Sequence, residues 1–220
     1  MINKSIAVIS FMMLCVTAFG QKSYYCETSI TNTIDGHIQS AHGKAWMKNP
    51  TTFRMQKTVD GKTMLIISNG SDVWLESPDK REAIHSRQPA EAIHQLTAHG
   101  RVVGNDLSGF LKTGAHKVGQ TRIQGALCNI YSRSDKNGTK FTLWVQTGAD
   151  QLTRREEVQA TLHTPDGAKN QMKTHTFLSK TEIYNWKIGQ PMPNTLFQPT
   201  KGYKILESSK GMKPAKPQKP

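Results

Sequence analysis

Histidines are the side chains of this 220-residue sequence best suited to acid–base or metal chemistry, and there are eight of them. His94 and His99 lie five residues apart on a segment expected to be helical, which is off the three- or four-residue spacing that places two side chains on one face. His85 and His116 flank that segment, but no cysteine or carboxylate completes a recognisable ligand set. We therefore predict no metal site and expect these histidines on the surface or in a lid.

Paired carboxylates are the next candidates for chemistry. Glu156 and Glu157 are adjacent on a predicted strand, so their side chains point to opposite faces and cannot cooperate. Arg154 and Arg155 beside them indicate cross-strand ion pairs instead. Neither a Gly-x-Ser-x-Gly elbow nor a phosphate-binding glycine loop occurs. The sequence therefore predicts no catalytic residues, no cofactor and no enzyme, with a hydrolase built around a convergent histidine site as a remote alternative.

The N-terminus has the pattern of a secretory signal. Lys4 supplies positive charge, the apolar stretch Ile6–Val16 is too short to span a bilayer, and Ala18-Phe19-Gly20 fits a small-x-small cleavage site. We predict that residues 1–20 are removed and that the remaining chain is exported and soluble. An uncleaved anchor is the alternative.

Positive charge dominates the composition, with 29 Lys and Arg against 16 Asp and Glu. Such an excess attracts nucleic acid, anionic lipid or an acidic partner, and export argues against nucleic acid and for an envelope surface. Residues 208–220 hold lysines and prolines with little to bury, so we predict a disordered tail. That tail is either a weak tether to anionic membrane or a solubilising end.

Two cysteines, Cys26 and Cys128, remain once Cys15 leaves with the signal. In an oxidising compartment they either form a disulfide, closing a loop of about 100 residues, or stay as two separate buried thiols. The sequence leaves both open because it does not place the two Cβ atoms.

Turn signals divide the rest of the chain into strands. Residues 22–87 and 117–188 have strand patterns, and residues 88–116 have weak helical spacing. Asp60-Gly61 and Asn69-Gly70 predict two-residue hairpin turns, and residues 49–52 predict a turn with proline at its second position.

These turns fix a register in which Trp46 faces Met55, Met55 faces Ile66, and Ile66 faces Val73. Directly opposite residues share a face of the sheet. One face then carries Trp46, Phe53, Met55, Met64, Ile66, Val73 and Leu75, while the other is mixed.

The downstream strands repeat this logic around Asn137-Gly138, which pairs Ile130 with Val145. The predicted apolar face there holds Cys128, Ile130, Phe141, Leu143 and Val145, with Tyr131 and Trp144 on the other face. A long antiparallel sheet with one apolar face and about 30 residues of helical cover tends to curl. We predict a mainly β fold with a helical insertion: an incomplete antiparallel β-barrel, or half-barrel, with short helices as a lid.

The interior of this half-barrel is either solidly packed or leaves room for an apolar ligand. In the second case the expected ligand-binding residues are Trp46, Phe53, Met55, Met64, Ile66, Val73, Leu75, Phe141, Leu143 and Val145. Flexible methionine side chains suit such a surface.

Two segments, GKAWMKNPTTF and IISNGSDVWLESP, resemble the periplasmic outer-membrane lipoprotein carriers (LolA-like). The family run is Gly-x-x-Trp-hydrophobic-Lys-x-Pro-x-x-Phe, and NTLFQPTKGYKI resembles its closing Phe-x-Pro-x-x-Gly segment. Trp46, Pro50, Phe53 and Trp74 fall on the family pattern. The resemblance implies a LolA-like half-barrel domain over residues 21–207, with a helical lid above an apolar cavity.

By this resemblance the chain is an exported periplasmic carrier for lipoprotein acyl chains or other lipids, held without covalent chemistry. An inner-membrane donor and an outer-membrane acceptor are the implied partners. Asn49 stands where well-known carriers have an arginine, and Tyr24 begins strand-like sequence where they begin with a helix. The alternative is a non-enzymatic envelope sensor or interaction domain on the same fold, with a closed core.

Overall fold

The computed structural model describes residues 23–90, 92, 93, 107–166 and 171–208. The predicted signal peptide, nearly all of the predicted tail and most of the predicted first helix lie outside these residues. Within the described ranges, no helix has the length and apolar character needed to cross a membrane.

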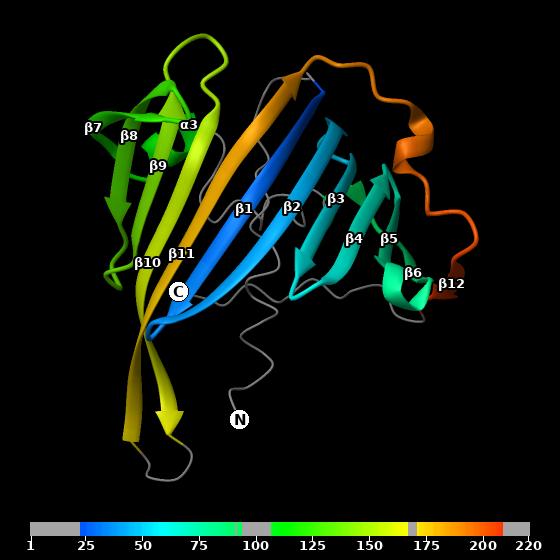
Figure 1. Ribbon diagram of the computed structural model, residues 1–220, viewed down its shortest axis with the longest axis horizontal. Coiled ribbons are helices and arrows are strands. Elements are labelled where there is room, and N and C mark those ends of the chain that lie inside the picture. Colours follow the sequence, from blue (N-terminus) through cyan, green and yellow to red (C-terminus); the bar gives the residue numbers. More distant parts are fainter. Residues whose placement is uncertain (1–22, 91, 94–106, 167–170, 209–220) are drawn as a thin grey trace.

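A single twelve-stranded sheet forms the molecule, with the strand order β12-β6-β5-β4-β3-β2-β1-β11-β10-β9-β8-β7 (Figure 1). The upstream strands are β1 (Tyr24–Ile34), β2 (His37–Asn49), β3 (Thr52–Val59), β4 (Lys62–Asn69), β5 (Asp72–Ser77) and β6 (Glu82–Arg87). The downstream strands are β7 (His116–Ile123), β8 (Ala126–Ser134), β9 (Lys140–Gln146), β10 (Thr153–Asp166), β11 (Gln171–Ile188) and β12 (Lys204–Glu207).

Neighbouring strands are antiparallel except for β12, which pairs with β6 in parallel. The sheet is open, because β12 and β7 end the order at two separate edges. Helical structure in the described ranges consists of α3 (Leu107–Lys112), the 3₁₀ turns η2 (Pro78–Lys80) and η3 (Asn194–Phe197), and one turn in which the Ile93 N–H donates to the Pro89 carbonyl. The mainly β, open architecture is as predicted, whereas these elements do not by themselves make a complete lid.

The first hairpin has the predicted register. Asp60 and Gly61 both adopt the left-handed conformation, with φ of 49° and 75°, as a two-residue turn of this kind requires. Met55 consequently lies opposite Ile66, and Val59 lies opposite Lys62.

The next turn is displaced by one residue along the chain. Ile66 lies opposite Leu75, and Ser68 lies opposite Val73, so Gly70 and Ser71 occupy the turn. The predicted pairing of Ile66 with Val73 is therefore wrong. The partner changes by two residues, and because side chains alternate with period two, the predicted face is preserved.

Trp46 lies on the opposite face from the one predicted. Asn49 pairs with Thr52 as the turn predicts, but the register shifts between Asn49 and Met47, which places Met47 opposite Phe53 and Trp46 opposite Arg54. A one-residue shift moves every later side chain to the other face. Met47 is thus on the apolar face, and Trp46 packs against the Tyr25 ring at 5.2 Å between centroids.

The downstream hairpin differs from prediction for a similar reason. Asp135 Oδ1 accepts hydrogen bonds from the N–H groups of Asn137 and Thr139, at 2.8 and 2.9 Å, so the loop holds three residues. This moves the pairing by one residue and places Tyr131 opposite Leu143. The face of Phe141, Leu143 and Val145 therefore carries Tyr131, while Cys128 and Ile130 lie on the other face with Trp144.

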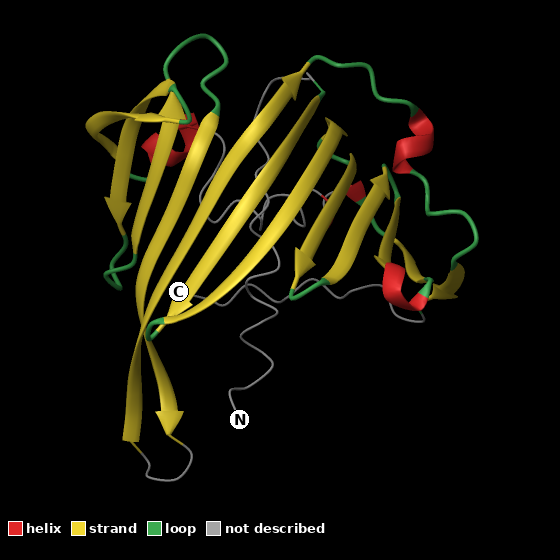
Figure 2. Ribbon diagram, viewed as in Figure 1, coloured by secondary structure: helices red, strands yellow, loops and turns green. Residues whose placement is uncertain are grey.

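The two faces of the sheet are covered by different segments (Figure 2). We call the face that carries Phe53, Met55 and Leu143 the inner face. Ile93 packs on its first cluster, and Phe110, which belongs to α3, packs on its second cluster. The outer face carries Trp46 and Trp74, and the segment after β11 packs on it, with Tyr203 against Trp74.

Candidate functional site

An apolar cluster occupies the inner face over β1, β2, β3, β5 and β11. Phe53, Met55 and Val73 are buried in it, and half-buried Ile66 packs against it, so four predicted ligand-binding residues come together. Met64 and Leu75 lie on the same face and are half-buried. The buried members are Tyr24, Cys26, Ala45, Met47, Phe53, Met55, Val73, Ile93 and Ile183.

A second apolar cluster lies on the same face toward β7. The predicted residues Phe141, Leu143 and Val145 meet there. Phe110 of α3 is buried against them, so this end of the face has a helix over it. The sequence thus identified members of both clusters, and it missed Met47 and Tyr131 because of the two register shifts.

Polar side chains separate the two clusters. Thr181 on β11 lies between Ile30 on β1 and Glu156 on β10. Glu156 is only 4% exposed, and Thr28 and Thr181 are buried as deeply. Within the described ranges, the hydroxyl oxygens of Thr28 and Thr181 have no hydrogen-bond partner, which is unusual for buried polar groups.

Lys57 adds a buried amine to the inner face. It lies opposite Met64 on β4 and opposite Gly43 on β2, and it is 5% exposed. Burial disfavours its charged form and lowers the Lys57 pKa to about 8. Sequence reasoning missed this residue, although its spacing of two from Met55 places it on the apolar face.

The two cysteines are free and buried. Cys26 is on the inner face and Cys128 on the outer face, with β11, β10 and β9 between their strands. Four strand spacings amount to about 19 Å, far beyond disulfide reach. Burial raises the pKa of both thiols, so neither is set up as a nucleophile.

The predicted cross-strand ion pair is confirmed for Arg155, which donates to Glu182 at 2.7 Å across the β10–β11 pair and lies 4.0 Å from Glu157. Arg154 instead donates to the neutral Gln146 Oε1, at 2.9 and 2.6 Å. Glu156 faces Thr181 on the inner side, so the two adjacent carboxylates do point to opposite faces.

Asn49, which replaces the arginine of the well-known carriers, has a local structural role. Its Oδ1 accepts hydrogen bonds from the N–H groups of Thr51 and Thr52, at 3.0 and 2.7 Å. Asparagine and aspartate commonly close turns in this way. The Asn49 side chain is therefore directed at the turn around Pro50 and supplies no positive charge.

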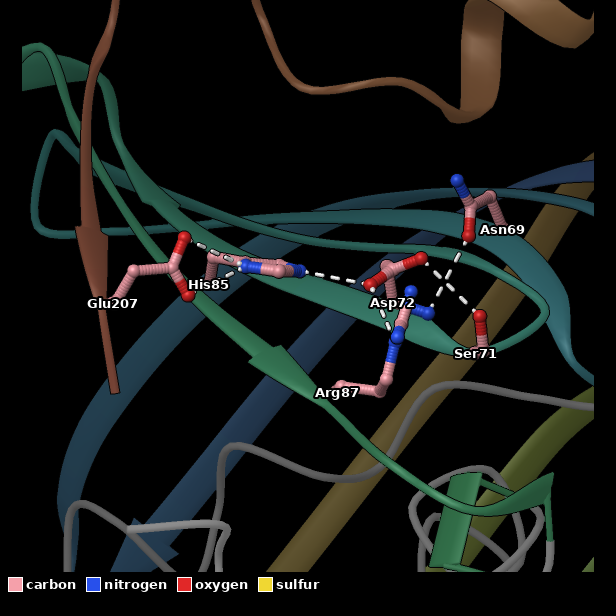
Figure 3. A network of polar contacts seen from close by, with 6 residues as sticks. All are labelled: Asn69, Ser71, Asp72, His85, Arg87 and Glu207. Atoms are coloured by element: carbon pink, nitrogen blue, oxygen red, sulfur yellow. Dashed lines mark hydrogen bonds and ion pairs between the residues drawn. The ribbon is translucent and has the colours of Figure 1, made fainter. Parts of the chain in front are cut away.

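His85 lies at the centre of a polar network near the β12 edge (Figure 3). Its Nδ1 contacts Glu207 Oε2 at 2.8 Å, its Nε2 contacts Asp72 Oδ1 at 2.9 Å, and its ring stacks on Trp74. Burial lowers the His85 pKa, but the hydrogen bonds to the two carboxylates outweigh it, so the pKa is raised. This network fastens β12 to β5 and β6.

No group of three or more His, Cys, Asp or Glu side chains in the described part of the chain is arranged to hold a metal ion. His94 and His99 lie outside that part.

Buried Glu76 anchors the closing segment to the outer face. Its two oxygens accept hydrogen bonds from the Thr200 N–H at 2.6 Å and from Thr200 Oγ1 at 2.8 Å. Phe197 in the same segment is buried, and Arg54 donates to the Leu196 carbonyl at 3.4 Å. The Phe-x-Pro-x-x-Gly segment thus packs on the outer face of the sheet and stabilises it through these contacts.

A protein-family model described as "Predicted periplasmic protein (DUF2092)" matches residues 21–204. The search of curated proteins gave no significant match.

Several solved structures are similar at low sequence identity. An uncharacterized conserved protein from Thermus thermophilus is 11% identical, with 93% of this chain and 99% of that chain covered and a TM-score of 0.48. The lipoprotein LppX of Mycobacterium tuberculosis is 11% identical, with 76% and 88% covered and a TM-score of 0.41. A LolA superfamily protein from Nitrosomonas europaea is 14% identical, with 89% and 97% covered and a TM-score of 0.36. The last of these structures is described as a member of the LolA superfamily, which the sequence motifs also resemble.

Proposed function

We propose that this chain, which belongs to the DUF2092 family of predicted periplasmic proteins, is a carrier or binding protein that holds lipid or lipoprotein acyl chains against its inner face. The observation that carries the proposal is the extent of the apolar inner face, on which two clusters of apolar side chains lie. The described residues that pack on these clusters from outside the sheet include Ile93 and, from the six-residue helix α3, Phe110.

Binding of this kind is apolar and reversible. Each methylene group removed from water contributes about 0.8 kcal/mol, so an acyl chain gains affinity without any covalent step. The proposed contact residues are those that lie on the inner face: Met47, Phe53, Met55, Met64, Ile66, Val73, Leu75, Phe141, Leu143 and Val145. Trp46 is left out because it lies on the outer face.

The proposal extends to location and partners. Residues 1–20 direct export, residues 21–207 form the binding domain in the periplasm, and residues 208–220 form a basic tail that makes weak contact with anionic membrane. Cargo passes from an inner-membrane donor to an outer-membrane acceptor.

Titration of delipidated protein with a fluorescent fatty acid tests the proposal. Met64→Glu places a charge on the inner face at a half-buried site, and Trp46→Glu places one on the outer face at another half-buried site. We expect Met64→Glu to weaken binding at least about tenfold, since a carboxylate in an apolar site is costly, and Trp46→Glu to leave it within about twofold. Absence of saturable binding, or equal effects of the two changes, contradicts the proposal.

A second candidate, an interaction or sensor domain, is favoured by one observation. Pairing of β10 with β9 ends at Gln159, and pairing of β11 with β1 ends at Phe177, so the ribbon beyond them extends from the sheet as two strands (Figure 1). A two-stranded ribbon is only marginally stable alone, and contact with a partner protein would stabilise this one. Mass spectrometry of the undelipidated protein separates the candidates: a carrier yields bound lipid, and a closed interaction domain yields none.

A further inference from the structure

We infer that protonation of His85 controls the pairing of β12 with β6 at the edge of the sheet. When His85 loses a proton, its contact with Glu207 breaks and β12 is released from the sheet. Neither the inner face nor a bound lipid takes part, so the inference is independent of the proposed function.

Both ring nitrogens of His85 contact carboxylates (Figure 3). Nε2 lies 2.9 Å from Asp72 Oδ1, and Nδ1 lies 3.0 and 2.8 Å from the two oxygens of Glu207. An ionised carboxylate only accepts hydrogen bonds, and a neutral imidazole donates from one nitrogen only. The two contacts are therefore hydrogen bonds at the same time only when His85 is protonated on both nitrogens.

The charges around His85 favour this protonated form. Among the described residues, the charged groups that face it are Asp72 from β5, Glu207 from β12 and Arg87 from β6, so negative charge is in excess. Glu76, the other acidic residue on this face of β5, is bonded to the closing segment. Burial lowers the His85 pKa, but the hydrogen bonds to the two carboxylates raise it above its ordinary value.

Asp72 is held more firmly than Glu207. Its Oδ2 accepts a hydrogen bond from Ser71 Oγ at 3.2 Å, and its Oδ1 lies 3.6 Å from Arg87 Nε, on a strand that is paired on both sides. The side chain of Glu207 is 74% exposed and, among the described residues, bonds to His85 alone. The proton that remains on neutral His85 therefore stays with Asp72, and the lone pair of Nδ1 repels Glu207.

The rest of β12 is weakly held. It has four residues, a neighbouring strand on one side only, and side chains that are exposed or half-buried. At its two ends, the Lys204 N–H donates to the Arg81 carbonyl and the Ser208 N–H donates to the His85 carbonyl, both at 2.9 Å. Repulsion at Glu207 acts next to the second of these bonds. Once β12 leaves, β6 becomes the edge strand, and its unpaired N–H and C=O groups are free to accept another strand.

Two measurements on the full chain, from about pH 5.5 to about pH 9.5, test the inference. The ¹⁵N chemical shifts of the imidazole report the protonation of His85. Hydrogen exchange with mass spectrometry, corrected for the intrinsic effect of pH on amide exchange, reports the protection of the β12 peptide. We expect that protection to fall about 10- to 100-fold as His85 loses its proton, because a hydrogen bond between charged groups is lost. Peptides of β1 should keep their protection.

Glu207→Gln is the variant that isolates the contact. A glutamine side chain both donates and accepts hydrogen bonds, so it pairs with neutral and with protonated His85. We expect the protection of β12 in this variant to vary less than about twofold over the same pH range. His116→Gln is the matched control, since it replaces an exposed histidine of β7 at the opposite edge of the sheet, and it should respond to pH as the wild-type protein does.

Four results would overturn the inference. Protection of β12 that stays constant while His85 loses its proton shows that the contact does not hold the strand. A His85 that keeps its proton up to about pH 9.5 shows a fixed contact with no response to pH. A wild-type response in Glu207→Gln assigns the effect to another group, and loss of protection in β1 together with β12 assigns it to global unfolding. Each of these results leaves the proposed lipid binding untouched, because that is measured by the fatty-acid titration.

Discussion

Replacing Thr181 with valine should stabilise the protein. Thr181 is 1% exposed, and its hydroxyl has no hydrogen-bond partner in the described part of the chain. Valine has nearly the same shape and an equally high strand propensity. The substitution therefore removes a buried, unpaired polar group and changes little else about β11.

The magnitude follows from the cost of leaving a buried polar group unpaired, about 1–3 kcal/mol. Valine removes the unpaired hydroxyl and with it most of this cost, so we expect the free energy of unfolding to increase by about 1–2 kcal/mol. For a chain of this size each kcal/mol moves Tm by about 2–4 °C, which gives a rise of about 2–8 °C.

Urea denaturation with an unchanged m-value provides the assay, because it reports stability without a change in the surface exposed. Thr200→Val is the matched control: its hydroxyl donates to buried Glu76 at 2.8 Å, so the same substitution there should cost about 1.5–3 kcal/mol. Opposite signs at the two sites support the reasoning. A loss of stability in Thr181→Val would show that its hydroxyl has a partner and would refute it.

Three further predictions concern pH, thiols and packing. Because the pKa of His85 is raised above its ordinary value of 6.5, its bonds to Asp72 and Glu207 stabilise the fold fully below that value. This contribution is lost as pH rises through the raised pKa, and a pH series of urea midpoints should show a step that His85→Gln lacks. Cys26 and Cys128 are buried with raised pKa values, so a thiol reagent should modify neither in native protein and both in denaturant. Leu143→Ala should cost about 2–5 kcal/mol of unfolding free energy, measured by the same denaturation, since Leu143 is 0% exposed.

The sequence predicted the open, mainly β architecture because its turns carry strong local signals. Asp60-Gly61 strongly predicts a two-residue hairpin turn. That turn fixes the pairing of β3 with β4 from Val59 back to Met55. That Met55 and Ile66 lie on one face was therefore predictable.

Errors arose where one extra residue entered a strand or a loop. The turn at Asn49 was predicted, but the irregularity at Lys48 has no sequence signature, and it alone moves Trp46 to the outer face. The three-residue loop after Asp135 did have a signature, because Asp135 sits two residues before Asn137 and four before Thr139 and caps both. That signature was overlooked because Asn137-Gly138 is typical of a two-residue turn.

The polar part of the candidate site was harder to predict than the apolar part. Lysine and glutamate in strands are usually exposed, so Lys57 and Glu156 gave no reason to expect burial. Spacing did contain the information for Lys57, because every second residue from Phe53 and Met55 shares their face. For Glu156, the decisive fact is the face of β10 on which it lies, opposite Leu143 on β9 and Thr181 on β11, which depends on the pairing of distant strands.

Fold stability does not account for the unpaired hydroxyls of Thr28 and Thr181. Valine is available at both positions at no cost in shape, and it would remove an energetic penalty from the centre of the inner face. Local features that lower stability without structural benefit are expected where a protein binds or acts. These hydroxyls lie between two apolar clusters, on the same face as a buried lysine and a buried carboxylate. Under the proposed function these hydroxyls face the bound molecule, so Thr28→Val should gain stability while it changes the affinity for the fluorescent fatty acid, measured by the same titration.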